Sequence, residues 1–411
     1  MSATARRVSP EIVVLAGCLV ALITFGPRAS AGLFQIPMST EYGWGRDVFS
    51  LAIALQNLLW GLGQPFAGAV ADRFGTFRVL CAGALLYAAG LVVMAYAATP
   101  GLMHLGAGVL IGFGLSGCSF NLVLGAFSKL LPESWRPLAF GAGTAAGSFG
   151  QFLFPPIGNI LIDALGWHQA LVIFAATLLL VLPLSFSLAT RPGANAATAG
   201  GPAPAVNQSI RQALAEAFQH RSYVLLVLGF FTCGFQLAFI TAHLPAYLKD
   251  AGLSAAVGGW TLATIGLANA VGSLSAGWLS TRMSKRWLLA WIYFGRSIAI
   301  AAFVLIPASP VTCILFGVFI GLLWLSTVPP TSSLVMLMFG TKYMAMLYGF
   351  AFFSHQVGGF LGVWLGGILY EAFGSYDIVW WLSVVLGLAS ALINLPIEER
   401  PVERPLAVPA E

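Results

Sequence analysis

Two arginines and a histidine stand inside stretches of sequence that are otherwise apolar. Arg28 lies in "CLVALITFGPRASAGLFQIP", residues 18–37, Arg296 lies within residues 287–307, and His355 lies near the middle of residues 344–371. A charge at the centre of a bilayer costs at least about 2.5 kcal/mol, so such side chains usually face a cavity or a partner. A guanidinium offers two parallel donors to a carboxylate, and an imidazole changes charge near neutral pH. These residue types therefore indicate an anion site, with His355 as the candidate proton carrier.

Each of these residues also has a purely structural interpretation. Arg28 could bond backbone carbonyls or extend toward the membrane surface, Arg296 could bond polar groups of adjacent helices, and His355 could be a core residue. No aspartate or glutamate lies deep in an apolar stretch; all of them fall in loops, tails or helix ends. We expect four more side chains to shape the pocket: Asn121, Gln151, Gln236 and Trp324. Each of them could equally join two helices.

The composition indicates that lipid is the main solvent of this chain. Of its 411 residues 59% are hydrophobic and only 8% are charged, against roughly 25% charged residues in a soluble domain. Backbone groups in lipid must bond to one another, so long apolar stretches predict helices, each needing about 20 residues to cross. The five cysteines stand singly and show neither metal-ligand nor disulfide spacing, so we expect no metal site.

Turn residues and charges divide the chain into twelve expected spans. Basic residues gather in the N-terminal tail, the even-numbered loops and the C-terminal region, whereas Arg46 and Lys249 stand in the odd-numbered loops. The positive-inside rule then places both termini in the cytoplasm of an inner membrane, and the positive charge needs no nucleic-acid partner to explain it. The expected spans are residues 11–36, 47–71, 77–97, 102–130, 137–164, 167–190, 222–247, 256–280, 287–307, 311–338, 344–371 and 377–396.

The chain also divides into two halves. We expect an N-terminal six-helix bundle over residues 1–190 and a C-terminal one over 222–396. Residues 191–221 form a cytoplasmic linker that is rich in Ala, Gly and Pro and ends in a short interfacial helix, and residues 397–411 form a cytoplasmic tail.

The two halves carry a weak internal repeat. "GNILIDALG", residues 158–166, aligns with "GGILYEAFG", residues 366–374, at an offset of 208. "GAVADRFGTFR", residues 68–78, aligns with the segment that begins at Gly277, at an offset of 209. Two matches at nearly the same offset indicate a duplication, which is how many transporters build a central site that opens to alternate sides.

The segment "GAVADRFGTFR" resembles the loop signature of the major facilitator superfamily. Gly68, Asp72, Arg73, Gly75 and Arg78 match its glycine, acid, base, glycine and base positions. The resemblance implies an all-α membrane protein with twelve transmembrane helices in two pseudo-repeated six-helix bundles around a central cavity. In this interpretation the loop is a latch that holds one state of the transporter. The alternative is a solvated loop that only obeys the positive-inside rule.

Three further stretches, residues 25–46, 149–167 and 352–367, look like the bacterial branch related to monocarboxylate transporters and oxalate/formate exchangers. Such relatives typically carry a carboxylate-binding arginine in helix 8. Here helix 8 has no charge, and Asn269 is its most polar central residue. Where the exchangers have a lysine in helix 11, this chain offers His355.

The resemblance implies a monomeric secondary transporter that carries a small organic anion through an inner membrane without a cofactor. A proton is the candidate co-substrate, and lipid surrounds the protein. Arg28 would pair with the carboxylate, and His243, at the outer end of helix 7, would be a gate residue. The alternatives are a multidrug or cation exporter, which needs membrane-embedded acids, and a non-transporting sensor of the same fold.

Overall fold

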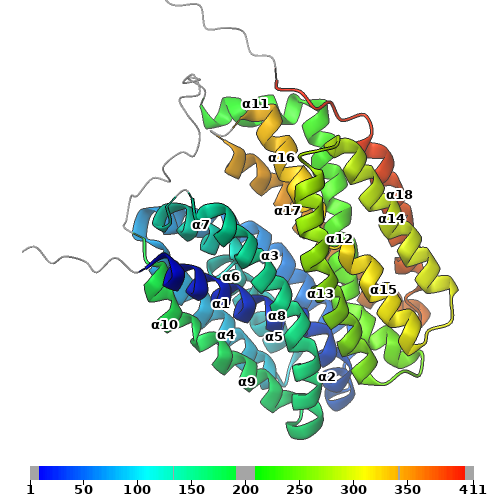
Figure 1. The fold of residues 1–411 in the computed structure, drawn as a ribbon. Coiled ribbons are helices and arrows are strands. Elements are labelled where there is room, and N and C mark those ends of the chain that lie inside the picture. Colours follow the sequence, from blue (N-terminus) through cyan, green and yellow to red (C-terminus); the bar gives the residue numbers. More distant parts are fainter. Residues whose placement is uncertain (1–8, 133, 191–208, 341–342, 403–411) are drawn as a thin grey trace, which may run out of the picture.

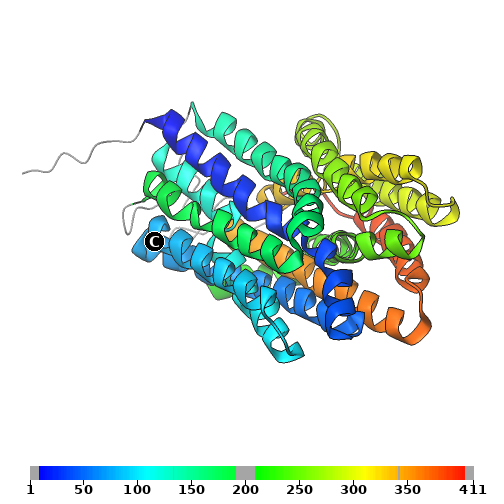
Figure 2. The same ribbon diagram turned by 90° about the horizontal axis from the view of Figure 1, so that it is seen from below.

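The computed structural model describes residues 9–132, 134–190, 209–340 and 343–402, and within these ranges the regular structure is entirely helical. The helices form two bundles side by side, one from each half of the chain (Figures 1 and 2).

The N-terminal bundle is built from ten α-helices and three short segments of other helical types within the described residues. Its elements are α1 (Pro10–Ala29), η1 (Ala31–Phe34), α2 (Gln35–Tyr42), α3 (Arg46–Phe74), α4 (Thr76–Ala95), α5 (Pro100–Met103), η2 (His104–Leu110), α6 (Ile111–Gly117), α7 (Phe120–Leu130), α8 (Arg136–Leu165), α9 (Trp167–Leu179), α10 (Val181–Ser185) and η3 (Phe186–Leu188).

The second half begins with the short helix α11 (Ile210–Gln219), which occupies the segment expected to hold a helix after the linker. Ser209 caps it, since its hydroxyl accepts from the backbone N–H of Gln212. The helices of the C-terminal bundle are α12 (Arg221–Asp250), α13 (Ala255–Leu279), α14 (Lys285–Leu305), α15 (Pro310–Leu322), α16 (Val328–Phe339), α17 (Met344–Phe373) and α18 (Asp377–Asn394).

The helices confirm the twelve expected spans within the described ranges. Nine helical segments are long and apolar enough to cross a membrane, α3 and α8 are 29 and 30 residues long, and α15 with α16 completes the set. Four spans differ from the simple helices expected, and one of these is the sixth, which is interrupted at Leu180 between α9 and α10 and ends in η3. The first continues through η1 to Tyr42, the fourth breaks at residues 118–119, and the tenth breaks at residues 323–327.

The two breaks respect the internal repeat. Adding the offset of 208 to residue 118 gives 326, so the interruption in the fourth span and that in the tenth span occupy equivalent places. The sequence shows the repeat at only two places. The structure adds a third similarity between the halves, the equivalent positions of the two helix interruptions.

The bundles meet along two helix pairs, α3 with α17 and α8 with α13. Glycines bring each pair close together: a methyl group at Gly61 would lie 2.7 Å from Cβ of Gln356, and one at Gly266 would lie 2.7 Å from Cβ of Gln151. Small residues allow such close approach where helices pack in lipid.

The contacts between bundles lie toward one end of the molecule. We call the end that carries Arg46 and Asp250 the far side, and the end that carries α11 the linker side. Among the described residues, hydrogen bonds between the bundles begin at the far side and reach as far as mid-helix, where Asn269 bonds to Ser148. The structure is therefore closed at the far side.

Candidate functional site

Arg28 stands where the first span changes direction. Pro27 lies in the last turn of α1, which ends at Ala29, and the chain continues as η1 after Ser30. Its neighbour Gly26 packs directly on the ring of Phe154. The Arg28 side chain points toward α3, where it contacts Asn57 and Trp60 inside the protein, and not toward the acyl chains.

Two residues of α3 hold the Arg28 guanidinium. Its Nη2 donates to Oδ1 of Asn57 at 2.7 Å, and its Cζ lies 4.6 Å from the centre of the Trp60 ring. Asn57 and Trp60 are buried, at 2% and 7% exposure, whereas Arg28 is partly exposed. Neither partner is an acid, and Nε of Arg28 has no hydrogen-bond partner among the residues that the structure describes. The guanidinium is thus held in place but keeps donor capacity.

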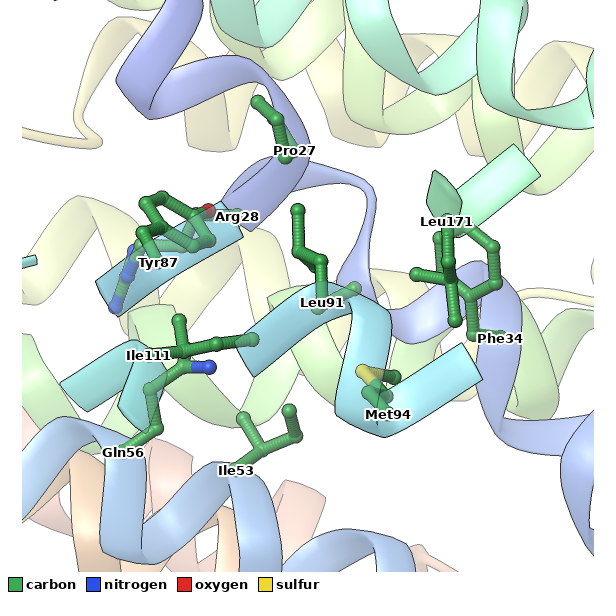
Figure 3. Close-up of a pocket in the computed structure, with 11 residues that line it drawn as sticks. Pro27, Arg28, Phe34, Ile53, Gln56, Tyr87, Leu91, Met94, Ile111 and Leu171 are labelled. Atoms are coloured by element: carbon green, nitrogen blue, oxygen red, sulfur yellow. The ribbon is translucent and has the colours of Figure 1, made fainter. Parts of the chain in front are cut away.

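A small cavity adjoins Arg28 within the N-terminal bundle (Figure 3). Its volume is about 20 Å³, room for about one water molecule. The phenol ring of Tyr87 and the amide of Gln56 line it together with Arg28, and apolar side chains such as Leu91 and Ile111 complete the wall.

Trp60 connects the Arg28 site to the other bundle. Its ring lies 5.4 Å from that of Phe352 on α17, in an edge-to-face arrangement. One turn further along α17, Gln356 packs against Gly61, and its Nε2 has no partner within the described ranges although the residue is fully buried. Arg28 therefore lies next to the junction of the two bundles.

Arg296 has a different environment. It is fully buried on α14, and its donors are directed at the break in the tenth span. Nε and Nη2 donate to the carbonyl of Leu323 at 2.9 and 2.6 Å, and Nη2 also donates to the carbonyl of Trp324. Nη1 donates to Oε1 of Gln236 at 3.4 Å. Arg296, Gln236 and Trp324, three residues expected in the pocket, are thus brought together, but as a buried cluster inside the C-terminal bundle.

The remaining expected pocket residues are spread over three helices. His355 on α17 stacks on Phe352, and its Nδ1 lies 3.1 Å from Oε1 of Gln356. Because that oxygen can only accept, Nδ1 carries the proton in this arrangement. Asn121 is exposed on α7. Gln151 on α8 is almost buried, and its Oε1 lacks a partner within the described residues.

The loop between the second and third spans forms a tight turn at Gly75, whose φ is +89°. This turn packs against the end of the sixth span, where the N–H of Thr76 donates to Oγ1 of Thr190 at 3.1 Å. Arg73 and Arg78 are exposed, and no side chain that the structure describes lies within 4 Å of the Cβ position of Gly68. The side chain of Asp72 lies outside what the structure describes, so the latch stays a prediction.

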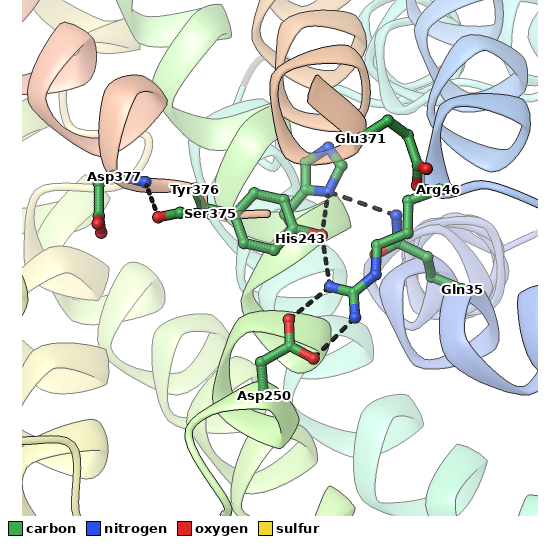
Figure 4. A network of polar contacts seen from close by, with 8 residues as sticks. All are labelled: Gln35, Arg46, His243, Asp250, Glu371, Ser375, Tyr376 and Asp377. Carbon is green, nitrogen blue, oxygen red and sulfur yellow. Dashed lines mark hydrogen bonds and ion pairs between the residues drawn. The ribbon is translucent and has the colours of Figure 1, made fainter. Parts of the chain in front are cut away.

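A polar network closes the far side (Figure 4). Arg46 at the start of α3 forms a two-pronged ion pair with Asp250 at the end of α12, with distances of 2.6 and 2.7 Å. The backbone N–H of Arg46 donates to Glu371 at 2.6 Å, and its Nη1 donates to the hydroxyl of Tyr376 at 3.0 Å. One residue of the N-terminal bundle thus engages three residues of the other.

His243 lies at the inner edge of this network and is fully buried. Its Nε2 lies 2.9 Å from the carbonyl of Val363, so Nε2 carries the proton and Nδ1 is an acceptor. Nδ1 faces the Tyr376 hydroxyl at 3.3 Å and the Gln35 amide at 3.4 Å. The expected gate histidine therefore joins both bundles through its contact with Gln35.

Sequence reasoning missed the side chains that contact Arg28 and those that close the far side. Asn57 and Trp60 stand in an apolar span without a charge to mark them. Arg46 did carry a signal, since it is one of two basic residues in the loops of the far side. An acid at the end of α12 was the obvious partner to look for.

Comparison with known proteins identifies the family. Residues 15–363 match the family model described as Major Facilitator Superfamily. The chain belongs to the Major Facilitator Superfamily. As a member of this superfamily it is a membrane transporter and not an enzyme.

Several superfamily relatives resemble it over most of their length. An uncharacterized MFS-type transporter of Bacillus subtilis (strain 168), YcxA, is 29% identical over 377 residues, covering 90% of this chain and 90% of that protein. Monocarboxylate transporter 13 of Rattus norvegicus is 25% identical over 404 residues, covering 94% and 88%. Human monocarboxylate transporter 11 is 25% identical and covers 93% and 82%.

Solved superfamily structures share the fold. A D-xylose-proton symporter superposes with a TM-score of 0.73 at 15% identity, covering 95% of this chain and 98% of that one. A bacterial homologue of the human lysosomal transporter Spinster, in an inward-facing and unoccupied conformation, gives 0.72 at 17% identity and covers 94% and 95%.

Proposed function

We propose that this transporter moves a small organic anion, a mono- or dicarboxylate, across an inner membrane by alternating access, with Arg28 as the residue that binds the carboxylate. The observation that carries the proposal is the coordination of Arg28. A guanidinium inside the first membrane-spanning segment has one neutral hydrogen-bond partner, one aromatic ring and an unpartnered Nε within the described part of the chain. An arriving carboxylate would complete its donor set with charge-assisted bonds.

The location of Arg28 supports a transport role. It lies beside Trp60, which contacts Phe352 of the opposite bundle, so an anion bound there sits next to the surface along which the bundles move. Similarity to monocarboxylate transporters of animals, at about a quarter identity, favours the same class of cargo.

The first test is ligand-induced thermal stabilisation in detergent with a panel of short mono- and dicarboxylates. A ligand that binds only the folded state raises the melting temperature, and at a hundred times its Kd it contributes about 2.7 kcal/mol. We expect stabilisation of the natural protein, and loss of that stabilisation in Arg28→Ala. Arg282→Ala, which removes an exposed arginine on the linker side, should respond as the natural protein does.

The second test is uptake into proteoliposomes. Saturable flux of one of these carboxylates, abolished in Arg28→Ala, is the expected result. Saturable flux of an organic cation without carboxylate flux would replace the proposal with the cation exporter. Equal carboxylate stabilisation in Arg28→Ala and the natural protein would remove Arg28 from the site.

For coupling and gating we propose the following roles. His355 is the proton carrier, because it contacts Gln356 and Phe352, and Phe352 packs against Trp60 beside Arg28. Asn121, Gln151, Gln236, Arg296 and Trp324 stay secondary candidates for the pocket. The far-side network around His243 is one gate, and the loop from Gly68 to Arg78 is the latch at the linker side, which we assign to the cytoplasm. Uptake driven by an inward proton gradient, and lost in His355→Gln, tests the carrier role.

A further inference from the structure

The break in the tenth span is held from two sides. On one side the carbonyls of Leu323 and Trp324 accept from Arg296. On the other side the backbone N–H of Leu325 donates to Oδ1 of Asn269 on α13 at 3.0 Å. A buried backbone N–H needs such a partner when its helix is interrupted.

Asn269 also reaches the opposite bundle. Its Nδ2 donates to Oγ of Ser148 on α8 at 3.1 Å. Both side chains are buried, at 1% exposure for Asn269 and 4% for Ser148. A single amide therefore links the N-terminal bundle, the helix α13 and the interruption between α15 and α16.

The repeat gives this contact a counterpart. Adding the offset of 208 to Gly61 gives 269, and adding it to Ser148 gives 356. Gly61 and Gln356 are in contact between α3 and α17, as Asn269 and Ser148 are between α13 and α8. The two contacts thus mark the same level on the two helix pairs along which the bundles meet. The contact between Asn269 and Ser148 differs from its counterpart in one respect: Asn269 also accepts a hydrogen bond from the backbone of a helix break.

We propose that Asn269 is a positioning residue that couples movement of the N-terminal bundle to the break between α15 and α16. The bond to Ser148 holds the amide so that its oxygen faces the Leu325 N–H. When the bundles move relative to each other, the amide loses Ser148 and turns, and the Leu325 N–H loses its acceptor. The segment 323–327 is then free to change shape together with the bundle motion. The proposal depends on the superfamily fold and not on which solute is carried.

Hydrogen–deuterium exchange of the full-length protein in detergent tests this coupling without a substrate. Among the described residues the Ser148 hydroxyl bonds to Asn269 and not to the tenth span. We nevertheless expect Ser148→Ala to raise exchange of a peptide covering 323–327 by about threefold, since one neutral hydrogen bond is worth a factor of about two to ten. Asn269→Leu removes both bonds and should raise it by about tenfold or more. Ser273→Ala is the matched control, because its hydroxyl bonds only within α13.

The outcomes separate coupling from simple packing. Unchanged exchange of 323–327 in Ser148→Ala, at the level of Ser273→Ala, would overturn the proposal even if Asn269→Leu exchanges faster. A uniform rise over all peptides of Ser148→Ala would also overturn it, because that pattern reports global loosening. Should Asn269→Leu fail to fold, the comparison of the two serine variants still decides.

Discussion

At the scale of single residues, the two arginines within the spans differ in their hydrogen-bond partners, and this difference distinguishes a structural arginine from one that can bind an anion. The donors of Arg296 are directed at two backbone carbonyls and a glutamine, and the residue is fully buried. Arg28 has one side-chain acceptor and remains partly exposed. The same guanidinium therefore stabilises a helix break in one half and keeps donor capacity for an anion in the other.

This difference predicts that the two arginines contribute unequally to the stability of the folded protein. Arg296→Leu leaves the carbonyls of Leu323 and Trp324 without donors in an apolar interior, so we expect the free energy of unfolding to fall by about 3 kcal/mol. Arg28→Leu should lower it by only about 1 kcal/mol, because a partly exposed side chain loses one hydrogen bond and one cation–π contact. Melting temperatures in detergent measure both. Equal losses in the two variants would contradict the distinction.

At the scale of elements, close helix packing in the C-terminal bundle depends on glycine. The carbonyl of Phe231 on α12 occupies the place where a Cβ at Gly358 of α17 would lie. Further along, the carbonyl of Phe235 stands in the same relation to Gly362. Close backbone approach of this kind is the main source of helix association in lipid, where apolar burial contributes little.

Two glycines of α17 provide a matched test of this packing. Gly358→Ala forces α12 and α17 apart, and we expect a loss of about 2 kcal/mol, within the range for overpacked sites. Gly349→Ala lies on the same helix with nothing within 4 Å of its Cβ position, so it should be neutral or slightly stabilising through helix propensity. Thermal unfolding of the two variants should diverge; similar melting temperatures would show that α17 can shift without cost.

The elements also show what the sequence could predict. Long apolar runs between turn residues were sufficient to place all twelve spans, since length and hydropathy are local properties. The break at 323–327 was not predictable, because the segment is itself apolar and its partners Arg296 and Asn269 lie 27 or more residues away. Pro329 and Pro330 lie in the first turn of α16, directly after the break.

The site was predictable to a similar extent. The free-energy cost of a charge in the bilayer predicts that Arg28 faces a cavity or a partner, and in the structure it donates to Asn57 on α3. Its partners Asn57 and Trp60 are ordinary residues of an apolar span, and only tertiary packing brings them to Arg28. Asn269 was noticed as a polar residue in helix 8, but its two bonds connect segments more than 50 residues away.

At the scale of the whole molecule, the polar contacts between the bundles are distributed unevenly. Charged groups close the far side, where Arg46 engages Asp250, Glu371 and Tyr376. Neutral groups make the contacts at mid-helix, such as Ser148 with Asn269. Ion pairs that hold one end closed, together with single neutral hydrogen bonds at mid-helix, suit a molecule that separates at the charged end and exchanges its central contacts as the bundles rotate.

This arrangement predicts that Asp250 sets the balance between far-side-closed and far-side-open states. Asp250→Asn removes the charge that Arg46 faces. The Asp250 side chain is 34% exposed, so solvent screening limits the loss to about 1 kcal/mol, a factor of about five in the population of the open state. A cysteine at position 50 reports that state, because Ser50 is fully buried against Gly367 in the closed molecule.

The measurement is the rate at which Ser50→Cys reacts with a membrane-impermeant thiol reagent, with the parent protein as background for the five native cysteines. Adding Asp250→Asn should raise the rate about fivefold. Asp377→Asn is the matched control, since it also removes one negative charge at the far side but leaves the Arg46 pair intact. If both charge changes raise the rate equally, general electrostatics at the far side controls opening, and the specific pair between the bundles does not.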